Sequence, residues 1–309
     1  MEKMSESKPL AVFSRGGAMF SNLWSVVGFL SWAEKAGYIP IVDFSETPPP
    51  NRWVGDEDRE GWTDYFEPVS PQSRNKDSLK KAFVFEERPT EFPIQDYSTS
   101  VDYVRVFHRY IALNKSSKAF LQPWLSALEQ YPSTLGVHIR GTDMKVARSH
   151  WAPPTHFQIG HTVDEALERS DFSHILVATE DSRALHFMLR RYGGRVITTD
   201  SIRTTAKRKL VHLSSSIPQY RYFLGLQVLR DAWLLASCAG FVSGHSNVSE
   251  HVQVIAPKPF KINLQIRRPQ VDILGSHPFQ IRITNLVREL TTSLWRGKDF
   301  RVLDRTPSE

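Results

Sequence analysis

The chain lacks the features that mark secreted, membrane-spanning or disulfide-stabilised proteins. Its 309 residues include one cysteine, Cys238, so an internal disulfide is excluded, and we expect a small buried side chain in a reducing compartment. No run approaches the roughly 18 apolar residues that a membrane-spanning helix needs. The first nine residues carry no apolar segment of the secretory type, so the expected location is the cytoplasm.

Several motifs that carry chemistry are also missing. There is no G-x-x-x-x-G-K-[ST] segment, which argues against a P-loop NTPase. His150, His156 and His161 do not form an H-E-x-x-H motif, so a zinc site is not expected. Asp56-Glu57-Asp58 has the D-x-D form of metal-dependent glycosyltransferases, but no apolar strand precedes it and Glu60 extends the acidic run. We interpret it as a solvated loop and expect neither metal nor cofactor.

What the chain does have is an excess of positive charge. The net charge is +6, and basic residues gather between Arg190 and Lys209. Such a surface attracts nucleic acid, anionic membrane or phosphorylated ligands alike. Nucleic-acid binding would require aromatic residues interleaved with the basic ones, and the Arg203 to Lys209 stretch has none. Nucleic acid is therefore not expected as a partner, and a basic nucleic-acid-binding protein is kept only as the rival hypothesis. Peripheral association with the anionic inner face of a membrane is compatible with the charge.

The beginning of the chain predicts a βαβ unit. Leu10 to Phe13 forms a short apolar run, Leu23 to Gly37 has helical spacing with Gly37 as a C-cap, and Tyr38 to Phe44 follows as a strand. From 45 to 100 the pattern degrades into loops with an aromatic cluster. Two further helices are predicted at Val101 to Leu113 and Leu121 to Gln130.

The second half alternates short apolar strands with helices, which predicts a doubly wound parallel sheet. The expected strands are Thr134–Arg140, His174–Thr179, Arg195–Thr198, Gly240–Ser243 and Phe260–Leu264. The expected helices are Thr162–Arg169, Asp181–Tyr192, Tyr220–Cys238 and Val248–Ile255, followed by a C-terminal one at Ile281–Trp295.

Ligands of open α/β sheets bind at the carboxyl ends of the strands, and polar residues gather there. The first strand of the second half ends in His138-Ile139-Arg140-Gly141-Thr142-Asp143, in which His138 and Arg140 share one face. The next ends in Thr179-Glu180-Asp181. A later one ends in Ser243-Gly244-His245-Ser246-Asn247, ahead of a helix. Ser246 alone could be a helix N-cap and Asp143 a turn residue. Three polar strand ends on one sheet favour a phosphorylated ligand, held by backbone N–H groups and by Arg140.

These blocks resemble a known family. H-I-R-G-T-D, V-A-T-E-D, a helix carrying Asp231 and F-V-S-G-H-S-N are similar in order and spacing to the three blocks of the α1,6-fucosyltransferases, within a superfamily that includes the protein O-fucosyltransferases. The resemblance covers mainly 136 to 253, and S-R-G-G-A-M-F-S-N-L-W near the start is similar to bacterial members. It implies a GT-B fold, with two Rossmann-like domains (1–125 and 126–309) facing a cleft and the C-terminal helix crossing back.

The resemblance also implies roles for particular residues. Arg140 would contact the β-phosphate of GDP-fucose, and His138 and Asp231 would hold the guanine nucleoside. The remaining binding residues would be Asp143, Glu180, Asp181, Ser246 and Asn247 of the three blocks and the Gly16-Gly17 turn after the first strand. The family inverts the anomeric carbon and needs no metal. The implied function is transfer of a sugar, expected to be fucose, from a GDP-sugar to a glycan or lipid-linked oligosaccharide, as in bacterial polysaccharide biosynthesis.

The chain departs from the family at two places. Gly141 stands where the α1,6 enzymes have a second arginine, which removes a positive charge next to the diphosphate and leaves the linkage and the donor sugar open. The carboxylate proposed as catalytic in the family has no counterpart between Met144 and Ser149. Arg140 and His150 are the catalytic candidates, and His150, His156, Asp43 and Glu46 are equally open as acceptors of the proton. The missing carboxylate also leaves open an inactive nucleotide-sugar-binding module.

Overall fold

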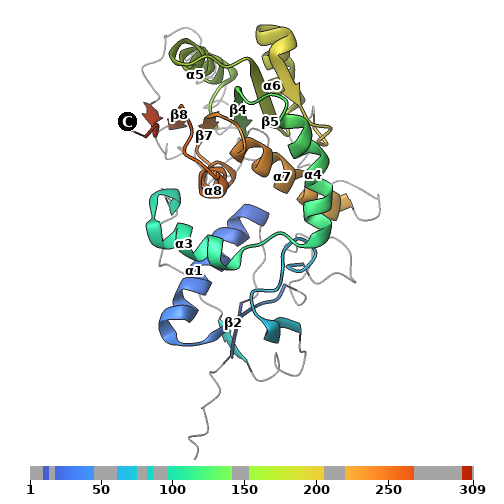
Figure 1. Cartoon of the computed structure of the whole chain (residues 1–309), viewed down its shortest axis with the longest axis vertical. Coiled ribbons are helices and arrows are strands. Elements are labelled where there is room, and N and C mark those ends of the chain that lie inside the picture. Colours follow the sequence, from blue (N-terminus) through green and yellow to red (C-terminus); the bar gives the residue numbers. More distant parts are fainter. Residues whose placement is uncertain are drawn as a thin grey trace, which may run out of the picture. The chain divides into compact units, whose positions relative to one another are not determined.

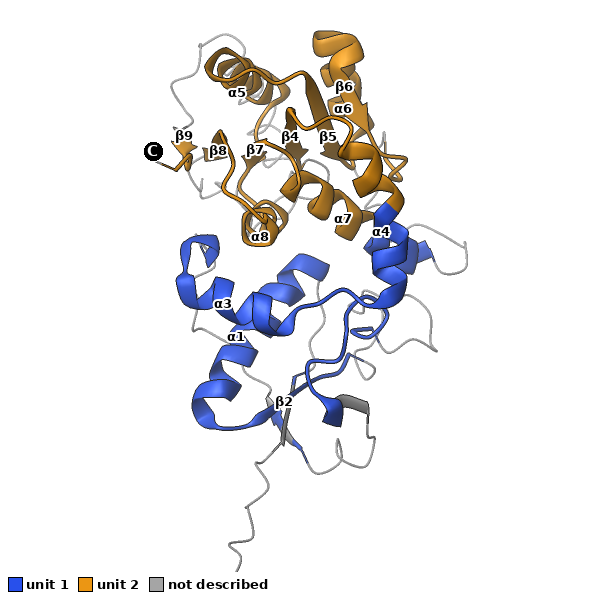
Figure 2. Cartoon of the chain, in the orientation of Figure 1, with its two compact units in different colours: residues 1–122, 216–226 blue, residues 123–215, 227–309 orange. Residues whose placement is uncertain are grey.

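A computed structural model describes residues 10–13, 18–44, 61–74, 82–85, 97–140, 153–204, 220–267 and 301–307. The chain divides into two compact units, residues 1–122 with 216–226 and residues 123–215 with 227–309 (Figure 2). Two helices cross the boundary between the units, α4 (Lys115–Leu128) and α7 (Tyr220–Ala236). Within the described residues no helix has both the length and the apolar character to cross a membrane.

The first unit contains the predicted βαβ unit. β1 (Leu10–Phe13), α1 (Met19–Ala36) and β2 (Ile39–Val42) follow one another, and β3 (Phe83–Phe85) adds a strand that was not predicted. The sheet order is β2-β1-β3 with all pairs parallel. Gly37 ends α1 with a φ of 77°, the left-handed conformation that glycine adopts without strain, so the predicted C-cap is confirmed.

The rest of the first unit is built around aromatic side chains. Trp62 stacks on Phe66 with ring centroids 4.5 Å apart, and both are buried, as the predicted aromatic cluster requires. Short 3-10 turns lie at Pro71–Arg74 and Tyr97–Thr99. α3 (Val101–Tyr110) begins after Ser100, whose side chain accepts the Tyr103 N–H.

The second unit contains the doubly wound sheet predicted for the second half (Figure 1). Its order is β6-β5-β4-β7-β8-β9, parallel except for the edge strand β9. The strands are β4 (Thr134–Ile139), β5 (His174–Thr179), β6 (Val196–Thr198), β7 (Gly240–Gly244), β8 (Asn263–Arg267) and β9 (Arg301–Asp304). The fold class is therefore α/β, as predicted.

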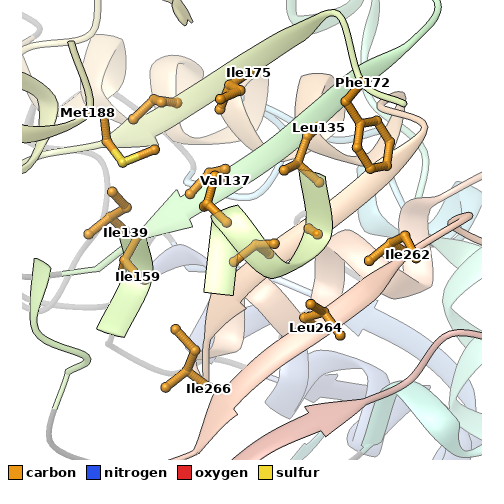
Figure 3. Close-up of a cluster of buried hydrophobic side chains, with 14 of the residues drawn as sticks. Leu135, Val137, Ile139, Ile159, Phe172, Ile175, Met188, Ile262, Leu264 and Ile266 are labelled. Atoms are coloured by element: carbon orange, nitrogen blue, oxygen red, sulfur yellow. The ribbon is translucent and has the colours of Figure 1, made fainter. Parts of the chain in front are cut away.

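Helices cover both faces of this sheet. α5 (His156–Arg169) and α6 (Ser182–Tyr192) lie on one face, and α7 and α8 (Asn247–Ile255) on the other; a 3-10 turn at Gly193–Arg195 leads into β6 (Figure 1). Leu135, Val137 and Ile139 of β4 point into the core under α5 and α6 (Figure 3). Because side chains alternate along a strand, Gly136 and His138 face the opposite side, where Gly136 meets Leu235 and Cys238.

Some element boundaries differ from the prediction for local reasons. α5 begins six residues before Thr162 because Thr155 and Gln158 form a reciprocal capping box. β8 begins at Asn263 instead of Phe260, since Phe260 is buried by stacking on Phe241 ahead of the strand. The predicted helix at Ile281–Trp295 and the acidic loop at Asp56–Asp58 lie outside the described residues.

Candidate functional site

The candidate site lies where the order of the second sheet reverses. The chain runs from β4 to β5 and β6 on one side, and later places β7 and β8 on the other side of β4. In such sheets the crevice beyond the carboxyl ends of the two central strands binds ligands. The register pairs His138 of β4 with Ser243 of β7, so two of the three predicted polar strand ends are neighbours at this switch point.

His138 is buried in a way that suits a ligand contact. Its side chain is 6% exposed, and its Nδ1 atom has no hydrogen-bond partner among the described residues. Burial lowers its pKa to about 4; the nearby Glu180 carboxylate opposes this shift and Arg140 adds to it, so the imidazole is neutral at physiological pH. Leaving a buried polar atom unsatisfied costs about 1–3 kcal/mol, which a polar ligand group would recover.

Ser243 presents a second such atom beside His138. It is 1% exposed, and its Oγ also has no hydrogen-bond partner in the described part of the chain. Because paired positions of adjacent parallel strands face the same side of the sheet, the two side chains lie on the same face, the one covered by α7 and α8. Ser243 was not among the predicted site residues. Its alignment with His138 is set by strand pairing, which the sequence does not display.

Arg140 and Glu180 meet at the ends of β4 and β5. Arg140 Nη1 lies 3.9 Å from Glu180 Oε1, and the two side chains are 28% and 20% exposed. At this distance the pair is a long ion pair in partial contact with solvent, so its contribution to stability is small. The guanidinium is accessible at the strand end, where it can make a bidentate contact with a phosphate group.

The turn between β7 and α8 forms the other side of the site. Ser246 is the N-cap of α8: its Oγ accepts from the Ser249 N–H at 3.1 Å, and Ser249 Oγ accepts from the Ser246 N–H at 2.8 Å. The alternative that Ser246 is a helix cap is thus confirmed, because its hydroxyl oxygen accepts a backbone N–H of the first turn. Asn247 is the first residue of α8, and its carbonyl accepts from His251 Nδ1 at 2.7 Å. A phosphate at this turn would face the positive end of the α8 dipole.

Asp181 is engaged within its own helix. It has no exposed surface and caps α6, with Oδ1 accepting the Arg183 N–H at 2.9 Å. The Arg183 guanidinium contacts the second oxygen at 3.3 Å. The carboxylate therefore fixes the start of α6 beside Glu180.

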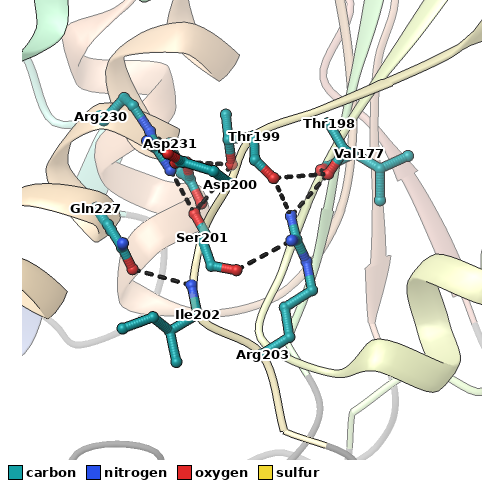
Figure 4. Close-up of polar contacts among 10 residues, drawn as sticks. All are labelled: Val177, Thr198, Thr199, Asp200, Ser201, Ile202, Arg203, Gln227, Arg230 and Asp231. Carbon is teal, nitrogen blue, oxygen red and sulfur yellow. Dashed lines mark hydrogen bonds and ion pairs between the residues drawn. The ribbon is translucent and has the colours of Figure 1, made fainter.

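Asp231 anchors the segment that follows β6 (Figure 4). Its two oxygens accept from Thr199 Oγ1 at 3.0 Å and from Ser201 Oγ at 2.8 Å, and Arg230 Nε lies 3.2 Å away. Burial raises the pKa of Asp231, and the guanidinium of Arg230 opposes that shift. Arg230 is itself stacked on Trp124 at 4.4 Å. In this structure the carboxylate supports the 199–203 segment.

Several predicted residues lie elsewhere. Gly16, Gly17, Asp143, His150 and the proton-acceptor candidate Glu46 fall outside the described residues. Asp43 follows β2 in the first unit, where its N–H donates to Phe13 O at 3.1 Å. His156 opens α5 and stacks on Phe187 at 5.5 Å. Across the described ranges no group of three or more His, Cys, Asp and Glu side chains could hold a metal ion.

Known structures share this fold. No protein-family model and no curated protein matches the sequence. The structure of NodZ α1,6-fucosyltransferase soaked with GDP-fucose matches with a TM-score of 0.59 at 13% identity, covering 97% of this chain and 100% of that one. NodZ co-crystallised with GDP matches with a TM-score of 0.56 at 15% identity, covering 85% of this chain and 96% of that one. NodZ from Bradyrhizobium matches with a TM-score of 0.58 at 14% identity, covering 97% of this chain and 100% of that one. The chain therefore shares its fold with these NodZ structures, and the resemblance predicted from the motifs is confirmed at the level of the fold.

Proposed function

We propose that the chain is a glycosyltransferase that moves a sugar, with fucose as the expected one, from a GDP-sugar to a glycan or glycolipid. The observation that carries the proposal is the position of Arg140 near the buried Nδ1 of His138, which has no hydrogen-bond partner among the described residues, at the switch point of the sheet. The fold supports it, because solved structures that share it include a fucosyltransferase crystallised with GDP and soaked with GDP-fucose.

The chemistry assigned to the site is displacement at the anomeric carbon. The bond from the sugar to the diphosphate breaks, and negative charge develops on the departing GDP. In our proposal Arg140 and the N–H groups at the start of α8 stabilise that charge in place of a metal ion. The acceptor hydroxyl attacks the opposite face, which inverts the anomeric centre, and its proton passes to a base for which His150, His156, Asp43 and Glu46 stay candidates.

The two units would divide the substrates. We assign the nucleotide to the second unit, which carries His138, Arg140 and the β7–α8 turn, and the acceptor to the first. His138 and Ser243 would contact the nucleoside, while Asp181 and Asp231 would hold neighbouring segments in place. The net charge of +6 would suit work at an anionic membrane face in the cytoplasm, where lipid-linked acceptors are available.

The test is GDP-fucose turnover by Arg140→Ala, with hydrolysis as the readout while the acceptor is unknown. Loss of one donor to the leaving group should reduce turnover by about a hundredfold or more, and Kd for GDP should rise. Arg191→Ala is the matched control: Arg191 pairs with Asp164 near the end of α6, so both readouts should stay near wild type. Near-normal turnover by Arg140→Ala would refute the phosphate assignment. GDP binding without any turnover by wild type would leave an inactive nucleotide-sugar-binding module.

A further inference from the structure

A fully buried carboxylate lies one turn into α8. Glu250 has no exposed surface, and it is the acidic residue of the first turn of the helix whose N-terminus adjoins the β7–α8 turn. At 1.5 Å per residue it lies about 6 Å along the axis from Ser246. The helix dipole stabilises this charge, but a buried carboxylate also needs a counter-charge and hydrogen-bond donors.

β8 and the residue that follows β9 supply those donors. Gln265 Nε2 of β8 donates to Glu250 Oε1 at 2.8 Å, and Arg305 Nη1 donates to Oε2 at 3.1 Å. The Arg305 side chain is 9% exposed, so this ion pair is shielded from solvent and is screened little by salt. His245, in the turn itself, places its Nε2 3.7 Å from Glu250 Oε1.

Arg305 follows the last described strand, β9, and is held in place by the start of β8. Its backbone N–H donates to Asn263 O at 2.8 Å, and its guanidinium also donates to Gln253 Oε1 at 3.0 Å. Thr306 Oγ1 accepts the Asn263 N–H at 2.9 Å, which extends the pairing of β9 with β8. The guanidinium therefore reaches Glu250 in a fixed geometry, from a segment about 55 residues away in sequence.

These contacts have an electrostatic consequence for the nucleotide site. A negative charge buried one turn behind the α8 N-terminus repels a diphosphate at that N-terminus, because the low-dielectric interior screens it weakly. We propose that Arg305 is a positioning residue that neutralises Glu250 and thereby permits diphosphate binding at the β7–α8 turn. This inference rests on the proposed function, since it takes that turn as the phosphate site.

The experiment compares GDP with its uncharged nucleoside in four variants. Kd for GDP is measured by calorimetry, and guanosine binding by competition with a fluorescent GDP analogue. Arg305→Met should raise the Kd for GDP by about tenfold and the Kd for guanosine by less than about threefold, because the unbalanced charge acts on the phosphates. Arg305→Lys keeps the charge and should bind GDP within about threefold of wild type. Glu250→Gln should bind GDP more tightly, and the double variant Glu250→Gln/Arg305→Met should return to within about threefold of wild type.

The double variant separates charge compensation from a structural role. If Arg305→Met weakens guanosine binding as much as GDP binding, or if the double variant does not recover the wild-type affinity for GDP, the inference is wrong. Should Arg305→Met not fold, Glu250→Gln and the double variant still decide the matter, because both lack the buried charge. A wild-type protein that binds neither GDP nor pyrophosphate would refute the proposed function itself, whereas normal wild-type binding with unchanged variants refutes this inference alone.

Discussion

Substitution of Gly244 by alanine should disturb the proposed nucleotide site from within the sheet. A Cβ at Gly244, the last residue of β7, would lie 2.7 Å from Pro154 Cδ and 2.8 Å from its Cγ. Real Cβ atoms do not approach a ring carbon this closely, so either the strand end or the segment before α5 must move. That movement would displace the β7–α8 turn from its place beside His138.

Gly240, at the other end of the same strand, provides the matched control. A Cβ there would lie 2.5 Å from Phe172 Cζ, so the steric conflict is at least as severe. The two glycines are about 13 Å apart along β7 at roughly 3.3 Å per residue, and Gly240 is at the amino end, away from the site. Overpacking of this kind costs about 1–3 kcal/mol, which should lower the melting temperature of either variant by roughly 2–12 °C.

GDP binding distinguishes the two variants. At a temperature well below both melting transitions, Gly244→Ala should raise Kd for GDP by about tenfold or more, since a shift of a fraction of an ångström misaligns the contacts to the phosphates. Gly240→Ala should bind within about twofold of wild type. If the two variants lose affinity equally, or if Gly244→Ala binds normally, the placement of the site at this strand end is wrong.

Two further predictions concern stability. Burial lowers the pKa of both His138 and His251 to about 4. Between about pH 6.5 and 4 the unfolded state therefore binds more protons than the folded state. As the pH falls across that window, the free energy of unfolding should decrease by up to roughly 3 kcal/mol per histidine. Urea unfolding of His251→Gln should lose part of this pH dependence; an unchanged slope would contradict the burial argument. Asp231→Asn should lower the free energy of unfolding by about 1–3 kcal/mol at pH 7, whereas Asp200→Asn, whose 70% exposed carboxylate also pairs with Arg230, should cost less than about 1 kcal/mol. Equal losses in chemical denaturation would show that the buried contacts of Asp231 are not the stabilising ones.

The elements with continuous apolar runs or strong helical spacing were predictable. β5 has the predicted bounds, and β4, β7 and α6 differ by one residue, because a parallel strand buried on both faces shows as an unbroken apolar run. β3 has three residues, and β9 consists of two apolar residues between Arg301 and Asp304. Each forms because a neighbouring strand pairs with it, which no local pattern reports.

The site was predictable to the extent that it depends on strand ends. His138, Arg140 and Glu180 do gather, because parallel strands bring their carboxyl ends to one edge. The partners of Asp231 were not visible in the sequence, since Thr199 and Ser201 lie about thirty residues before it and meet it through the packing of α7. The contact between Glu250 and Arg305 was not predictable either, because the two residues are 55 positions apart in the sequence.

The start of α5 could have been predicted from its capping residues. Thr155 followed three residues later by Gln158 is a capping-box signature, and it would have placed the start of the helix at His156. For α8 the two interpretations of Ser246 could not be separated without coordinates, because an N-cap serine and a phosphate-binding serine occupy the same position in a sequence.

The proposed function depends on a GDP-sugar site at the switch point of the second sheet. Calorimetric titration of the intact protein with GDP tests it most directly, with ADP and UDP as controls for base recognition. We expect saturable one-to-one binding of GDP that is tighter than that of either control and is weakened in Arg140→Ala. Absence of binding at millimolar GDP, or equal binding by wild type and Arg140→Ala, would contradict it.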